Sequence, residues 1–162
     1  MPFGRIAGRL VAAAALACSA PAGRAADTEV PLPAQKPVDP DYARAKKAIE
    51  AKNWPEAVKL LEQAATRQES NPNVHNLLGY AERHQGHMEA AFAHYRKALA
   101  LDPKHRGAHE YVGEAYLQVG DPAKAEEHLA QLAKICSSSC EEYRDLKAKI
   151  EDYKREHAGS GR

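Results

Sequence analysis

Several features that mark large classes of proteins are missing from this chain of 162 residues. No apolar run approaches the roughly 20 residues that a membrane-spanning helix requires. The sequence contains no phosphate-cradling glycine loop, no nucleophile elbow and no zinc-binding helix motif. Basic residues form no run interleaved with aromatic residues, so nucleic acid is not an expected partner. We therefore expect a protein that is not an enzyme, holds no cofactor and has no transmembrane helix.

Acidic residues are absent from the segment 1–26, which carries arginines and a short alanine-rich apolar core from Leu10 to Ala17. This arrangement predicts a secretory signal peptide over residues 1–26. Small residues suit cleavage after Ala22, Ala25 or Ala26. A mitochondrial presequence, which is also rich in arginine and poor in acidic residues, is the alternative. The expected location is the periplasm or the cell exterior, which is compatible with association with the cell envelope.

Cysteine is scarce, and Cys18 lies inside the predicted signal peptide. A lipoprotein signal would need a branched residue where Ala15 stands, so a lipid anchor at Cys18 is the less favoured alternative.

The mature chain is close to electrically neutral. Cleavage would remove three of the 23 basic residues and leave 20 against 22 acidic ones, a net charge near −2. Its first residues, 27–40, contain four prolines and no periodic apolar pattern, so we expect a flexible tether over residues 27–38.

Apolar residues follow two successive helical stripes between Pro72 and Pro103. The first stripe ends near Gly86, and the second ends at Asp102-Pro103, because proline cannot continue a helix. The stripe residues are Val74, Leu77, Leu78 and Ala81, followed by Met88, Ala91, Phe92, Tyr95, Ala98 and Leu99. The pattern predicts a helical hairpin, with small residues such as Gly79 where the two helices approach closely.

The hairpin pattern recurs at a constant spacing of 34 positions along the chain. Residues 34 positions after Gly79, Gly86 and Ala91 are Gly113, Gly120 and Ala125; those 34 positions before are Ala45, Lys52 and Ala57. Since a single hairpin cannot bury both of its faces, a repeat of this length predicts stacked hairpins.

These residues resemble the tetratricopeptide repeat family. The middle copy carries Leu78-Gly79, Gly86, Ala91, Tyr95, Ala98 and Pro103; the third carries Val112-Gly113, Tyr116, Gly120-Asp121 and Ala125; the first carries Asn53-Trp54, Ala57, Leu61 and Ala64. In the first copy, Asp41 and Arg44 stand where the family prefers large apolar residues, which suggests a polar terminal cap. The resemblance implies an all-α fold, a right-handed superhelical stack of three hairpins plus a C-terminal capping helix. The expected repeats span 39–71, 72–105 and 106–137, followed by a capping helix over 138–157 and a disordered tail over 158–162.

Polar residues followed by proline mark three of the expected helix starts, at Asp39-Pro40, Asn71-Pro72 and Asp121-Pro122. Asn53 with Glu56 has capping spacing for another helix. Ser139 with Glu142 predicts a capping box that would make Cys140 the first residue of the capping helix. The apolar stripe of that helix is Tyr143, Leu146, Ile150 and Tyr153.

In the family, the first helices of successive repeats line a concave groove that binds a segment of a protein partner. Mapped through the constant repeat spacing, the groove positions are Asp39, Tyr42, Lys46 and Ile49; Asn73, Asn76, Tyr80 and Arg83; and Gly107, Glu110, Glu114 and Leu117. We expect Tyr42, Tyr80 and Arg83 to be the main anchors, because aromatic residues and arginine dominate interfaces. The alternative is that the two tyrosines only seal the seams between hairpins. Of the positions that some family members use to clamp a terminal carboxylate, only Lys46 fits.

Cys136 and Cys140 stand at the turn between the third repeat and the capping helix. Two nearby thiols usually pair in an oxidising compartment, so we expect a structural disulfide. The alternative is a redox-active dithiol or a Cu(I) site built on the same two residues. The end of the chain from Cys140 also resembles small exported bacterial tetratricopeptide proteins.

The histidines offer no convincing metal site. His105 and His109 are four residues apart, and His84 and His87 flank Gly86, but neither pair has a third ligand at a dependable spacing. We expect them to be solvated on helix surfaces.

Overall fold

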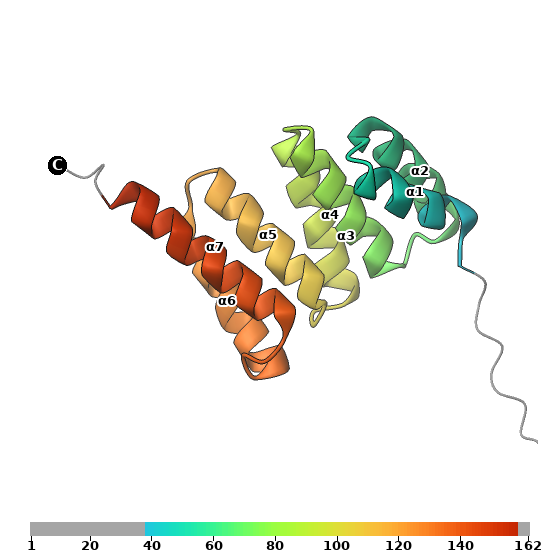
Figure 1. Ribbon diagram of the computed structural model, residues 1–162. Helices are drawn as coiled ribbons and strands as arrows, with labels where there is room; N and C mark the ends of the chain where they lie inside the picture. The colour runs from blue at the N-terminus through green and yellow to red at the C-terminus, as the bar shows by residue number, and fades with distance from the viewer. Residues whose placement is uncertain (1–37, 159–162) are drawn as a thin grey trace, which may run out of the picture. The chain divides into compact units, whose positions relative to one another are not determined.

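The computed structural model describes residues 38–158, and within this range the chain folds into helices joined by short turns, without any strand (Figure 1). The helices are α1 (Pro40–Glu50), α2 (Trp54–Arg67), α3 (Pro72–His84), α4 (Met88–Leu101), α5 (Arg106–Gln118), α6 (Pro122–Cys136) and α7 (Glu141–His157). The expected all-α stack is therefore confirmed. The predicted signal peptide, nearly all of the tether and the end of the tail lie outside the described residues. No helix between residues 38 and 158 combines the length and the apolar character needed to cross a membrane.

Consecutive helices pack as three hairpins, α1 with α2, α3 with α4 and α5 with α6. Each hairpin packs against the next, and α5 also contacts α3. Helix α7 lies along α5 and α6 at the end of the stack (Figure 1). Every hairpin thus hides apolar surface that its neighbour would leave exposed, as expected for a repeat protein.

Local chemistry fixes most of the helix starts. The side chain of Asp39 accepts hydrogen bonds from the backbone N–H groups of Asp41 and Tyr42, and Asn71 and Asp121 cap their helices in the same way. Proline follows each of these caps, where its missing N–H costs nothing. Asn53 accepts the predicted hydrogen bond from the backbone of Glu56, at 3.4 Å.

The predicted capping box at Ser139 is wrong. Helix α7 begins at Glu141, and its N-cap, Cys140, makes no side-chain capping bond. Ser137 and Ser138 adopt left-handed backbone angles, with φ of 51° and 62°. The turn that they form directs the Ser139 hydroxyl back to the end of α6, where it donates to the carbonyl oxygen of Cys136 at 2.8 Å.

Glycine allows the closest helix contacts in the stack. A Cβ atom on Gly79 would lie 2.6 Å from the ring of Tyr95, which is fully buried between α3 and α4. A Cβ atom on Gly113 would lie 2.6 Å from Leu146 of α7. The two glycines hold the same position in successive repeats. A missing side chain at this position therefore lets α4 pack closely on α3, and α7 on α5.

Candidate partner-binding groove

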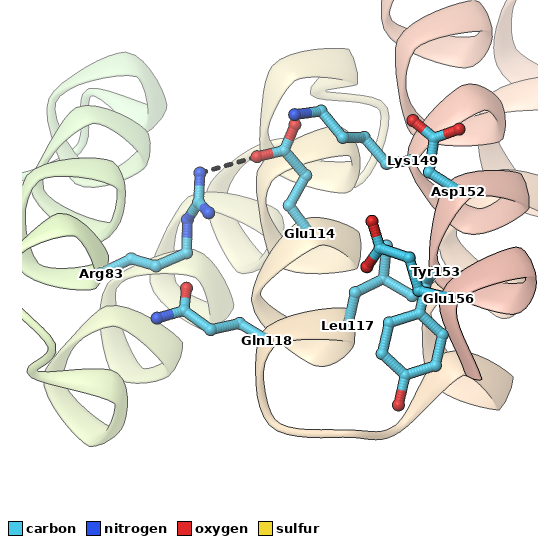
Figure 2. Close-up of a pocket in the computed structure, with 8 residues that line it drawn as sticks. All are labelled: Arg83, Glu114, Leu117, Gln118, Lys149, Asp152, Tyr153 and Glu156. Atoms are coloured by element: carbon cyan, nitrogen blue, oxygen red, sulfur yellow. Dashed lines mark hydrogen bonds and ion pairs between the residues drawn. The ribbon is translucent and has the colours of Figure 1, made fainter. Parts of the chain in front are cut away.

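A pocket of about 360 Å³ opens where α3, α5 and α7 meet (Figure 2). Three of the predicted groove residues, Arg83, Glu114 and Leu117, line it together. The other lining residues are Gln118, Lys149, Asp152, Tyr153 and Glu156. Half of the lining thus comes from α7, which the sequence mapping treated only as a cap. The charged residues of its exposed face, Lys149, Asp152 and Glu156, were the available signal.

Arg83 and Glu114 form an ion pair that joins α3 to α5, with Nη2 and Oε2 2.7 Å apart (Figure 2). Both side chains are largely buried, at 10% and 16% exposure. The arginine that the sequence marked as a partner anchor is therefore already held by a carboxylate of the next repeat. The pair connects the α3 and α5 sides of the pocket.

Aromatic rings surround this ion pair. Tyr80 lies beneath the Arg83 guanidinium, 5.4 Å from ring centroid to Cζ, and its ring is 4.6 Å from that of Tyr111. On its other side, Tyr80 contacts His84, which stacks on Trp54 with centroids 4.3 Å apart. The tyrosine thus stands at a seam between hairpins and also beside the pocket, so both interpretations of its role remain compatible with its position.

Glu110 is the most perturbed carboxyl group of the groove. Burial, with smaller contributions from Glu114, Asp145, Glu142 and Glu141, raises its pKa to about 8. The neighbours are all carboxyl groups, which disfavour a further negative charge. Glu110 is therefore mostly protonated at neutral pH.

The remaining predicted groove residues do not gather at this pocket. Tyr42 and Asp39 line a separate depression beside α2, Ile49 packs on the first hairpin core, and Lys46 is exposed. Asn73 is exposed and its Oδ1 accepts a hydrogen bond from His105 Nε2 at 3.1 Å.

Asn76 is almost fully buried, at 5% exposure, and its Oδ1 has no hydrogen-bond partner in the described part of the chain. Its amide nitrogen would lie 3.2 Å from a Cβ atom on Gly107, so the side chain faces the first turn of α5.

The expectation that the histidines are solvated is wrong for His75 and His109, which are 8% and 6% exposed. Each donates from Nε2 to a backbone carbonyl, that of Glu69 at 2.8 Å and that of Pro103 at 3.1 Å. The two carbonyls also hold the same position in successive repeats. His105 does not share a ligand face with His109, because it is the N-cap of α5.

Each buried histidine faces a second histidine from the partner helix of its hairpin. The rings of His75 and His94 have centroids 5.8 Å apart, and the Nδ1 atoms of His109 and His128 are 2.9 Å apart. Burial lowers the pKa of His94 and His109, and burial followed by the charge of His109 lowers that of His128 to about 4. The signal for these pairs in the sequence is the recurrence of both histidines at the repeat spacing, whereas spacings of four residues within one helix do not reveal it.

The sulfur atoms of Cys136 and Cys140 lie within bonding distance, with Cα atoms 5.8 Å apart. Cys140 is 8% exposed. The positions allow the predicted disulfide. No cluster of three or more metal-binding side chains occurs within residues 38–158.

Comparisons with known proteins agree with this fold. Two models of the tetratricopeptide repeat match the sequence, over residues 42–106 and 82–150. No curated protein sequence matches the chain.

Several solved structures share the fold. The type III secretion translocator chaperone SycD of Yersinia enterocolitica is 18% identical with a TM-score of 0.64, covering 73% of this chain and 83% of its own. The TPR2B domain of yeast Sti1, in a complex with pHsp70, is 20% identical with a TM-score of 0.64, covering 72% and 94%. PcrH, in complex with the chaperone-binding region of PopD, is 18% identical with a TM-score of 0.63, covering 72% and 90%. At these identities the likeness shows the fold alone.

Proposed function

Because this chain is built from tetratricopeptide repeats over residues 42–150, we propose that it is a non-enzymatic scaffold that binds a segment of another protein in the groove of α3, α5 and α7. The observation that carries the proposal is the pocket in Figure 2, whose wall is held in place by the Arg83–Glu114 pair. A preorganised wall reduces the ordering cost of binding. The similar structures of PcrH and the Sti1 domain contain bound protein segments, which supports the same use of the fold here.

Site-specific photo-crosslinking in the native host tests this function. A photoreactive residue at Gln118, which is exposed and lines the pocket, should capture a protein partner. The matched control is Ala93 of α4, which is exposed and lies outside the groove helices. Capture of the same partner with equal yield from both positions, or from neither, contradicts the proposal.

We also propose that the protein is exported. The segment 1–26, which contains arginine but no acidic residue, supports this location. Sequencing the N-terminus of the protein from its native compartment should find a start at residue 23, 26 or 27. An intact Met1 would contradict export by a cleaved leader.

The competing proposal of a dithiol or Cu(I)-handling protein rests on the closeness of Cys136 and Cys140. The burial of Cys140 favours a structural clip over a reactive pair, because reactive thiols are usually accessible.

A further inference from the structure

Carboxyl groups outnumber cationic groups along the α5 and α7 sides of the groove. Glu110 and Glu114 lie on α5, and Glu142, Asp145, Asp152 and Glu156 follow on α7. Ion pairs within the chain engage Glu114 with Arg83, Glu142 with Arg106, and Asp152 with Arg155. Lys149 is the remaining cation of the pocket lining. Asp145 and Glu156 have no ion-pair partner within residues 38–158, and neither has Glu110, which is mostly protonated in the free protein. Carboxyl groups are thus in excess over cations along this part of the groove.

Glu110 is the part of this surface that most needs a positive charge. It is half-buried, and the groups that face it from its own helix and from α7 are Glu114, Asp145, Glu142 and Glu141. The carboxyl group of Glu110 is therefore neutral in the free protein, and a cation placed beside it would favour its ionised form.

Two further features favour a donor-rich, cationic ligand. Tyr80 and Tyr111 form an aromatic pair beside the acidic residues, and aromatic faces attract lysine and arginine side chains. Asn76, the residue 34 positions before Glu110, keeps a buried Oδ1 acceptor without a donor in the described part of the chain. Neither the aromatic faces nor an amide oxygen would stabilise an anionic ligand, whereas both suit a peptide segment that carries N–H donors.

We propose that the partner segment is cationic and that it places a lysine or arginine side chain against Glu110, between α5 and α7 and beside the Tyr80–Tyr111 pair. The inference rests on the proposed function and names the class of its partner. The binding segment would be rich in lysine or arginine and poor in acidic residues, since like charges across an interface are costly.

Binding must then release a proton. The carboxyl group of Glu110 is mostly protonated in the free protein at pH 7 and becomes charged beside the cation, so its pKa falls on binding. Affinity for a cationic segment should therefore increase as the pH rises towards 8, and it should decrease with added salt.

The test uses the full mature chain and fluorescence anisotropy with three short labelled peptides, in which alanine alternates with lysine, glutamine or glutamate. The lysine peptide should bind more tightly than the glutamine peptide, and the glutamate peptide should bind least. Glu110→Gln and Asp145→Asn should each weaken binding of the lysine peptide by roughly 5- to 10-fold. Glu110→Gln should also abolish proton release, measured by calorimetry in two buffers of different ionisation enthalpy. Glu89→Gln, at an exposed position of α4 outside the groove, is the matched control and should change neither quantity.

Equal binding of the lysine and glutamine peptides, or a lysine affinity that Glu110→Gln leaves unchanged, overturns the inference. The crosslinking result separates this failure from failure of the function itself. A partner captured at Gln118 whose binding ignores Glu110→Gln leaves the scaffold function standing without its cationic specificity. Absence of any capture at Gln118 removes both.

Discussion

His109 and His128 share one proton between two facing nitrogen atoms. His109 donates its Nε2 proton to the Pro103 carbonyl, so in the neutral ring Nδ1 can only accept, and His128 must donate to it. Burial is the main reason that the pKa values of both rings are lowered, with the charge of His105 adding to the effect at His109, where Asp102 is the nearby carboxylate, and those of His109 and Lys124 adding to it at His128. A proton added to His109 Nδ1 would also place two donors face to face. The fold therefore keeps these histidines neutral.

This arrangement predicts a loss of stability in mild acid. Histidines with a lowered pKa in the folded state bind more protons when unfolded, so their stabilising effect is complete above about pH 6.5 and decreases as the pH falls. For His128 the loss continues to about pH 4. The free energy of unfolding, measured by urea denaturation, should fall by on the order of 1–2 kcal/mol over this interval after allowance for partial exposure.

Replacing the second histidine of each pair should flatten that pH dependence. The first repeat has buried Leu60 at the position of His94 and His128, so the double variant His94→Leu/His128→Leu follows a solution that the chain already uses. The same change at exposed His157 serves as the control. An unchanged acid limb in the double variant would show that other groups cause the loss.

Gly79 cannot accept a larger side chain, because the neighbouring Tyr95 ring has no room to move aside. The Tyr95 ring is fully buried, and an added Cβ atom would come within 2.6 Å of it. Gly79→Ala should therefore destabilise the protein by about 1–3 kcal/mol, despite the higher helix propensity of alanine. Thermal denaturation of Gly79→Ala, Tyr95→Leu and the double variant should show that the two costs are not additive, since the smaller side chain makes room for the methyl group. Additive costs would mean that the clash is not the cause.

Among the elements, α1 is held at its start by one side chain that both caps it and binds α2. Asp39 caps its start and also accepts two hydrogen bonds from Arg67 of α2, at 2.8 and 3.0 Å. The bond from Arg67 is the main reason that the pKa of Asp39 falls to about 2. A depressed carboxyl pKa contributes stability above about pH 4, which is lost as the pH falls towards 2.

Asp39→Asn should release α1 without unfolding the rest. Asparagine keeps the capping oxygen but removes the charge that holds Arg67. Hydrogen exchange should become faster in α1, with α5 and α6 unchanged. Asp121→Asn is the matched control, because Asp121 caps α6 through Lys124 N at 3.1 Å. Equal effects of the two variants on their helices would assign the role of Asp39 to capping alone.

A thiol titration tests the disulfide predicted at the turn between α6 and α7. Protein purified from its native compartment should contain no titratable thiol from Cys136 or Cys140. The double serine variant should lose no more than about 2 kcal/mol, because the closed loop is short. Two titratable thiols in the native protein would instead support the dithiol alternative.

Local signals explain which elements could be predicted. Caps such as Asp39-Pro40 and the left-handed glycine at Gly86, with φ of 83°, act within one turn of helix, so the sequence displays them directly. The pairing of Arg83 with Glu114 spans 31 positions and depends on how two hairpins pack. The sequence could place both residues on the groove, but it could not show that they would form an ion pair with each other.

At the scale of the whole molecule, the main contacts among the helices of residues 38–158 lie between near neighbours in the stack. Helix α7 covers the end of the stack. Its fully buried Leu146 packs against Gly113, and its Ile150 packs with residues of α5 and α6. In such a linear array, stability is the sum of local units and their interfaces. The effect of a core substitution should therefore depend on its place along the array.

Leu146→Ala should cost about 2–5 kcal/mol at the α7 interface. Hydrogen exchange read helix by helix should then show the largest loss of protection in α5, α6 and α7, and a smaller one in α1 and α2. Leu61→Ala, which removes an equally buried leucine from the first hairpin, is the matched control and should give the reverse gradient. A uniform loss in both variants would show that the helices of residues 38–158 unfold as one cooperative unit, because every interface would then fail together.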